Sequence, residues 1–152
     1  MVTGGARGIG GAIAEALERD RHRVAILDRD QCDLADAADV RRAAAATGHA
    51  DVLVHAAAAF DQAALVGLTR VLALTLGPSG ITVNAVAPGL TRTAATQEGV
   101  ESEAFEEVRR GQALPRSLVP GDTAAAVAFL CSDAGEALTG QTLNVDDGLV
   151  FH

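Results

Sequence analysis

The stretch Thr-Gly-Gly-Ala-Arg-Gly-Ile-Gly at residues 3–10 decides the fold. It follows a short apolar segment and precedes a helix expected from Gly8 to about Asp20, where apolar residues recur at helical spacing. Glycines let a backbone turn sharply and approach an anion, and a helix N-terminus presents free N–H groups to it. We therefore predict a pyrophosphate-binding turn, with a glycine-rich turn that holds no ligand as the alternative. The expected contacts are Gly4, Arg7, Gly8, Ile9 and Gly10.

Asp28 ends the next expected strand, Arg23–Leu27, about twenty residues after the turn. A carboxylate at this place accepts hydrogen bonds from the hydroxyls of an adenosine ribose and repels a 2′-phosphate. The cofactor expected is therefore NAD, with NADP disfavoured, although the neighbouring Arg29 softens that preference. The alternative is that Asp28 only opens a loop.

Helical and strand patterns alternate along the rest of the chain, which is typical of an α/β domain. We interpret residues 1–152 as one such domain. The expected strands are Asp51–Val54, Ile81–Val86 and Gln141–Val145. The expected helices are Asp36–Ala46, Phe60–Leu76, Glu101–Arg110 and one that starts at Pro120 with Asp122 as its N-cap.

Composition excludes several classes of protein. The net charge is −8 and the twelve basic residues are dispersed, so no nucleic-acid partner is expected. No run of about 18 apolar residues and no leader pattern is present, so we expect a cytoplasmic protein without a membrane partner. The two cysteines form no CxxC motif, the four histidines lack metal spacing, and the pair Asp146-Asp147 has no further ligands nearby in sequence. No metal site is therefore predicted.

Several motifs together resemble the short-chain dehydrogenase/reductase family. Residues 3–10 match its T-G-x-x-x-G-x-G turn, and residues 84–89, Asn-Ala-Val-Ala-Pro-Gly, match its late strand and turn. Residues 32–34, 67–70 and 138–146 match three further elements. The resemblance implies a Rossmann-like, doubly wound parallel sheet, shortened relative to the family, and an NAD(H)-linked oxidoreductase acting on an alcohol or carbonyl compound.

The resemblance also implies the rest of the site. It places Asp33 against the adenine amino group, Leu90 and Thr93 against the nicotinamide carboxamide, and a variable lid for a small-molecule substrate over residues 91–116. The helix Phe60–Leu76 corresponds to one that packs on a second subunit, so a homo-oligomer is expected. The further cofactor contacts carried over are Asp33, Leu34, Ala57, Pro88, Gly89, Leu90 and Thr93.

The departures from the family concern the chemistry. Two helix-plus-strand units are missing, between Asp28 and Asp33 and between Val54 and Phe60, and the family's catalytic Ser belongs to the second. The positions of the family's catalytic Tyr and Lys hold Ala58 and Gln62, and the whole chain contains neither Tyr nor Lys. His55 and Asp61 are candidate substitutes, but a strand-end side chain and a first-turn helix acid are the interpretations favoured for them. The catalytic residues are therefore unknown.

Three interpretations remain open at this point. The chain is an NAD-linked oxidoreductase by descent, or a cofactor- or partner-binding domain without catalysis, or a longer enzyme that here lacks internal segments. The substrate is not identified by any of these residues.

Overall fold

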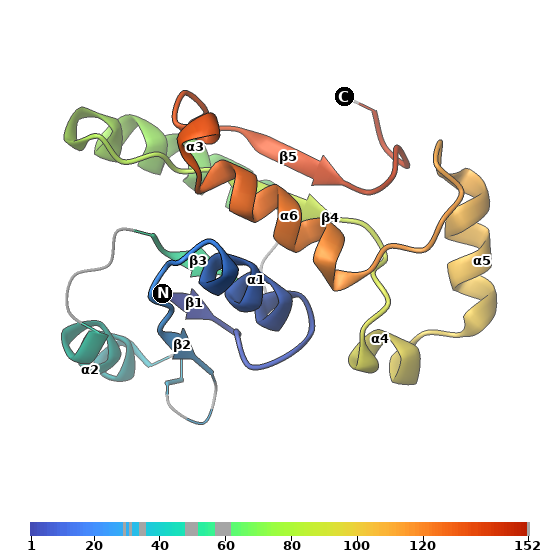
Figure 1. Cartoon of the computed structure of the whole chain (residues 1–152), viewed down its shortest axis with the longest axis horizontal. Coiled ribbons are helices and arrows are strands. Elements are labelled where there is room, and N and C mark those ends of the chain that lie inside the picture. Colours follow the sequence, from blue (N-terminus) through green and yellow to red (C-terminus); the bar gives the residue numbers. More distant parts are fainter. Residues whose placement is uncertain (29, 31, 34–35, 48–51, 57–61, 152) are drawn as a thin grey trace.

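The computed structural model describes residues 1–28, 30, 32–33, 36–47, 52–56 and 62–151 (Figure 1). Its strands are β1 (Val2–Thr3), β2 (Ile26–Leu27), β3 (Val54–His55), β4 (Ala85–Pro88) and β5 (Thr142–Val145). Its helices are α1 (Gly8–Arg19), α2 (Ala37–Thr47), α3 (Gln62–Leu76), α4 (Ala94–Gly99), α5 (Ser102–Gly111) and α6 (Pro120–Leu130), with short 3-10 turns η1 (Gly77–Ser79) and η2 (Asp133–Gly135).

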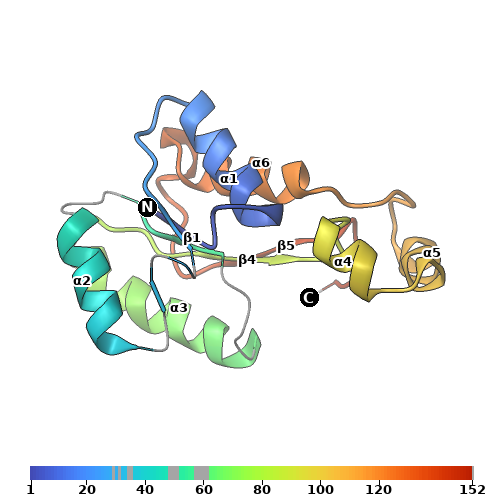
Figure 2. The same ribbon diagram turned by 90° about the horizontal axis from the view of Figure 1, so that it is seen from below.

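All the strand pairs are parallel. One sheet has the order β2-β1-β3, with Val2 opposite both Ile26 and Val54, and the other pairs β4 with β5. Figure 2 shows helices on both sides of the strands, with α1 and α6 on one side and α2 and α3 on the other. This confirms the predicted α/β class and its doubly wound arrangement, and it places the very short β1 in the middle of its sheet.

The core forms where α1 and α6 pack against each other. Its buried cluster combines small and branched side chains: Val2, Ile13, Ala14, Ala16, Leu17, Ala124 and Val127. Alanines allow the two helices to approach closely, which suits a chain with only 3% aromatic residues. Val54 of β3 and Val86 of β4 pack against the same cluster. One core therefore joins the two sheets and fixes the ends of their strands relative to each other.

The strand before residue 89 begins later than predicted. It covers Ala85–Pro88, whereas the expected strand was Ile81–Val86. Side chains hold the preceding residues: Val83 N–H donates to Thr139 Oγ1 at 3.1 Å, and Asn84 Nδ2 donates to the Leu138 carbonyl at 2.8 Å. Pro88 does not interrupt the ladder, because alternate residues donate to β5 and its missing N–H faces away from that strand.

The start of α6 also differs from the prediction. Val119 is the N-cap and Pro120 takes the first helical position, so Asp122 lies in the first turn rather than at the cap. Asp122 still stabilises this end, since its Oδ2 accepts a hydrogen bond from Val119 N–H at 2.7 Å. The helix predicted over Phe60–Leu76 corresponds to α3, which begins at Gln62 in the structure. Its predicted first residue, Phe60, lies outside the described residues.

Both cysteines are free; Cys32 is buried and Cys131 is half-buried. Among the described residues, no helix is both long enough and apolar enough to cross a bilayer.

Candidate functional site

The glycine turn has a backbone that side chains would disturb. Gly4 and Gly8 have φ angles of 68° and 59°, in the left-handed region that favours glycine. A Cβ on Gly10 would lie 2.1 Å from the carbonyl oxygen of Gly4, which no other residue can accommodate without a backbone shift. The turn therefore brings β1 and the first turn of α1 into contact.

The N-terminus of α1 has no side-chain cap. Its N-cap, Arg7, is exposed, has an extended backbone, and makes no side-chain capping hydrogen bond. Gly11 N–H donates to the Arg7 carbonyl at 3.0 Å, which is the first hydrogen bond of the helix. The N–H groups of Gly8, Ile9 and Gly10 come earlier in the sequence, in the first turn, where a helix has no carbonyl to pair with them. Uncapped N–H groups at the positive end of a helix dipole attract phosphate oxygens.

Asp28 lies at the same turn. It follows β2, and its Oδ2 accepts a hydrogen bond from Ala6 N–H at 3.1 Å. The two residues are 22 positions apart, so the parallel pairing of β1 with β2 is what brings the carboxylate to the glycine turn. The residue as a whole is half-buried.

The segment after β4 reaches the turn from the other side. A Cβ on Gly8 would lie 3.8 Å from Thr93 Cγ2. Thr93 is the N-cap of α4, and its Oγ1 accepts a hydrogen bond from Thr96 N–H at 3.1 Å. The fold thus places the segment predicted to contact nicotinamide beside the segment predicted to contact pyrophosphate.

Gly89 is held tightly at the carboxyl end of β4. A Cβ there would lie 2.9 Å from Leu118 Cδ1 and 3.0 Å from the Cα of Asp146. Its N–H donates to the Val145 carbonyl at 2.9 Å. Pro88 beside it is exposed, and Leu90 is half-buried.

The remaining predicted contacts are less fully described. Leu34 and Ala57 lie outside the described residues, as do Ala58 and Asp61. Ala56, which precedes Ala57, has its Cβ 3.2 Å from a Cβ built on Gly10, so β3 ends at the glycine turn. Asp33 is exposed, and its N–H donates to Asp39 Oδ2 at 3.1 Å, at the start of α2.

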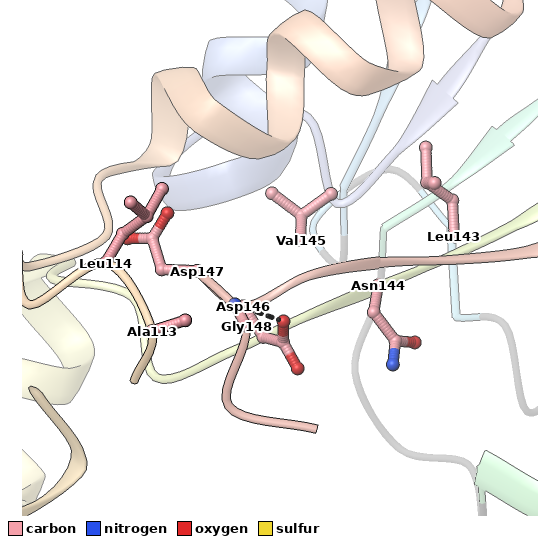
Figure 3. Close-up of a pocket in the computed structure, with 8 residues that line it drawn as sticks. All are labelled: Ala113, Leu114, Leu143, Asn144, Val145, Asp146, Asp147 and Gly148. Atoms are coloured by element: carbon pink, nitrogen blue, oxygen red, sulfur yellow. Dashed lines mark hydrogen bonds between the residues drawn. The ribbon is translucent and has the colours of Figure 1, made fainter. Parts of the chain in front are cut away.

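A pocket of about 410 Å³ lies at the carboxyl end of β5 (Figure 3). Its lining includes Ala113, Leu114 and Asn144 together with Asp146 and Asp147. Asp146 is fully engaged with the following turn, since its two oxygens accept hydrogen bonds from the N–H groups of residues 148 and 150, both at 3.0 Å. The pocket adjoins the predicted nicotinamide segment, because Asp146 packs directly on Gly89.

Arg116 organises the charges beside this pocket. It donates to Asp122 Oδ1 at 2.9 Å and to Asp147 Oδ1 at 2.8 Å. The pKa of Arg116 is raised above its usual value, mainly by the hydrogen bond to Asp122. The negative charges of Asp122 and Asp147 raise this pKa further. Sequence reasoning missed this arginine, which lies 31 residues from Asp147. The one available signal was Asp147 itself, which stands where the resembling motif has glycine.

Among the described residues, the acidic side chains do not assemble into a metal centre. In the part of the chain that the structure describes, no three His, Cys, Asp or Glu side chains are grouped so that they could hold an ion. Asp146 and Asp147 instead bind backbone N–H groups and an arginine, respectively.

Family comparisons agree with this architecture. A family model described as enoyl-(acyl carrier protein) reductase matches residues 54–150, and one for the NAD-dependent epimerase/dehydratase family matches residues 1–67. A short-chain dehydrogenase/reductase of Armillaria gallica is 44% identical over 94 residues, which cover 56% of this chain and 35% of that protein. The chain therefore spans about a third of the length of this relative.

Solved structures extend the comparison to nearly the whole chain. The TT0495 protein of Thermus thermophilus aligns with a TM-score of 0.84 and 28% identity, covering 97% of this chain and 96% of the other. RhlG of Pseudomonas aeruginosa, in an active-site complex with NADP, aligns with a TM-score of 0.84 and 25% identity, covering 97% and 94%. The chain belongs to the short-chain dehydrogenase/reductase family.

Proposed function

We propose that this chain is an NAD(H)-binding module of the short-chain dehydrogenase/reductase family. The observation that carries the proposal is the uncapped N-terminus of α1, held against β1 by Gly4 and Gly10. In this proposal the N–H groups of Gly8, Ile9 and Gly10 bind the pyrophosphate, with Arg7 as an added cation. The adenine end lies towards Asp33, and the nicotinamide end lies towards Pro88, Gly89, Leu90 and Thr93. Leu34 and Ala57, outside the described residues, stay expected cofactor contacts.

The preference for NAD(H) over NADP(H) is assigned to Asp28. Its carboxylate is fixed at the turn by the hydrogen bond from Ala6 N–H, close to where a ribose joined to the pyrophosphate must lie. The negative carboxylate of Asp28 would repel a 2′-phosphate, whereas the ribose hydroxyls would donate hydrogen bonds to this carboxylate. The NADP complex of RhlG shows that a relative binds the other cofactor, so this preference needs its own measurement.

Bound nicotinamide supplies hydride transfer, and the protein must supply the proton donor. Without Tyr or Lys, the chain lacks the acid and the neighbouring ammonium that its family relies on. Loss of a positioned acid costs about 10²–10⁴-fold in rate. We therefore expect binding of the cofactor without reduction of simple ketones at ordinary rates, and oxidoreductase activity on a small alcohol or carbonyl compound remains the second candidate.

Assembly is proposed through α3. Its side chains Leu68, Val71 and Leu74 are 52%, 60% and 81% exposed, which is costly for a helix of this apolarity in water. Pairing of α3 with a second copy of the chain would cover them. Light scattering should then give a mass of about twice 15.4 kDa or more, and a monomer at micromolar concentration would contradict this assembly.

Fluorescence of NADH tests the binding proposal cleanly. The chain has neither Trp nor Tyr, so protein emission does not interfere with that of the nicotinamide. We expect saturable enhancement of NADH emission and its reversal by NAD⁺, with negligible NADH oxidation when a simple ketone is added. No change in emission at any NADH concentration would contradict binding, and turnover at normal enzymatic rates would contradict the account of the missing acid.

A further inference from the structure

One aromatic ring anchors the first half of α5. Phe105 is the one buried residue of this helix and is 5% exposed. Figure 1 shows α5 beyond the ends of β4 and β5, away from the core that α1 and α6 form. The other end of the helix is tied separately, because the N–H groups of residues 113 and 114 donate to the carbonyls of residues 148 and 147 at 3.3 and 3.0 Å. The contacts of Phe105 therefore determine how the first half of α5 is placed.

The ring of Phe105 is covered by Arg92. The guanidinium carbon lies 4.6 Å from the centre of the ring, at the distance of a cation–π contact. Within the described part of the chain, the side chain of Arg92 forms no hydrogen bond or ion pair that would hold it elsewhere. The attraction between a cation and the face of a ring is stronger where water is partly excluded, and Arg92 is half-buried. This contact is therefore the interaction that directs the Arg92 side chain towards α5.

The backbone of Arg92 lies at the margin of the core. Its N–H donates to the Leu118 carbonyl at 2.9 Å, and Thr91 forms a parallel bridge with Leu118. Leu118 and Thr91 are buried. The bridge is isolated, so less pairing holds residues 91–93 than holds the residues inside β4. A ligand that contacts this segment can therefore order it further.

The next residue, Thr93, faces the glycine turn. Its Cγ2 would lie 3.8 Å from a Cβ on Gly8. The backbone at Thr93 is extended, with φ −126° and ψ 166°, and neighbouring side chains on an extended backbone point to opposite sides. One short segment thus meets the glycine turn through Thr93 and α5 through Arg92.

We propose that Arg92 is a positioning residue that transmits occupancy of the cofactor site to α5 through Phe105. The proposal rests on the proposed function, because it requires a nucleotide that contacts Gly8 and Thr93. Such a nucleotide restricts the motion of residues 91–93, and the guanidinium then holds the Phe105 ring in one place. The coupling is reciprocal, so the Arg92–Phe105 contact in turn favours the form of the chain that binds the nucleotide.

Hydrogen exchange followed by mass spectrometry, with and without saturating NAD⁺, tests the proposal. Slower exchange of the α1 amides reports occupancy of the glycine turn, and slower exchange of the α5 amides reports its transmission. In the unaltered chain we expect NAD⁺ to slow both, by about fivefold at α5. Arg92→Gln removes the charge above the ring, so the slowing should remain at α1 and disappear at α5. Arg110→Gln removes an exposed arginine of α5 itself and should keep both effects.

The affinity for NAD⁺ gives an independent readout. Because the coupling is reciprocal, its loss should weaken NAD⁺ binding by the same factor, about fivefold, in Arg92→Gln and in Phe105→Leu. Both substitutions remove the same contact, so the double variant should bind NAD⁺ no more weakly than either single variant. Side chains that only support the fold separately would instead give effects that multiply.

Three results would overturn the role of Arg92. These are slowing at α1 without slowing at α5 in the unaltered chain, slowing at α5 that survives in Arg92→Gln, and a double variant whose affinity falls by the product of the single effects. Circular dichroism verifies that the variants are folded, and the exchange test on Arg92→Gln stands even where Phe105→Leu unfolds. If NAD⁺ leaves the α1 amides of the unaltered chain unchanged, the proposed function itself fails; if α1 responds and one of the three results is found, only the role of Arg92 fails.

Discussion

The α-carbon of Gly10 faces the carbonyl oxygen of Gly4 so closely that a Cβ on residue 10 would lie 2.1 Å from that oxygen. The contact joins the end of β1 to the first turn of α1. It explains why glycine is needed at position 10 for packing, independently of any ligand. The same contact holds the open helix N-terminus in place.

Gly10→Ala should therefore damage both folding and binding. The new methyl forces the turn apart, and we expect a loss of about 3 kcal/mol in the free energy of unfolding, together with loss of NADH binding. Gly121→Ala is the matched control, because a Cβ on this exposed glycine of α6 would meet nothing within 4 Å. It should stabilise the chain by about 0.5–1 kcal/mol. Equal urea midpoints for the two variants would show that the Gly4–Gly10 contact is not as tight as described.

Asp28→Asn tests the source of the cofactor preference. The amide retains an oxygen that can accept from Ala6 N–H but removes the charge that repels a 2′-phosphate. We expect the ratio of NAD⁺ to NADP⁺ affinity to fall about tenfold, mainly through tighter NADP⁺ binding. An unchanged ratio would assign the preference to another residue. Asp30→Asn, a nearby exposed acid, serves as the control.

Arg116→Ala should lower the unfolding temperature more than Arg41→Ala, which removes an exposed arginine from α2. The reason is that Asp147 stays buried after its only described cation is removed. Adding Asp147→Gly should restore part of the loss, because glycine relieves both the unpaired charge and the φ of 54°. A double variant that is less stable than Arg116→Ala alone would be incompatible with this explanation.

Glu106 and Arg109 provide a prediction about pH. Arg109 donates to Glu106 and holds the pKa of that carboxyl below its usual value. The ion pair therefore contributes stability above the usual pKa of Glu and loses it as the pH falls through the lowered value. Glu106→Gln should be slightly less stable than the unaltered chain at pH 7, and this small difference should disappear in acid. Both side chains are substantially exposed, so a large difference at pH 7 would contradict the pairing as a surface interaction.

Local patterns predicted much of this fold. The glycine turn and α1 are encoded by glycines and apolar spacing within about twenty residues, and the structure has them where they were expected. Sequence patterns were less accurate where residues distant in the sequence determine the boundary of an element. β4 starts at Ala85 because Thr139 and Asn84 side chains hold the residues before it, and no local property of Ile81–Val83 reports that.

In the candidate site, too, features set by local spacing were predicted and features set by distant residues were not. Asp28 was expected near the turn from its spacing alone, and the structure adds the hydrogen bond to Ala6. The proximity of Thr93 to Gly8 followed only from the resemblance, since 85 residues separate them. For Arg116 the sequence offered only the indirect signal of Asp147 in place of glycine, because its partners Asp122 and Asp147 come together only when β5 and α6 are in place.

Isothermal titration calorimetry of the unaltered chain with NAD⁺ and with NADP⁺ tests the central claim most directly. The account predicts saturable binding of one NAD⁺ per chain and weaker binding of NADP⁺. Binding of neither nucleotide would contradict the dinucleotide site, and tighter binding of NADP⁺ would contradict the role assigned to Asp28.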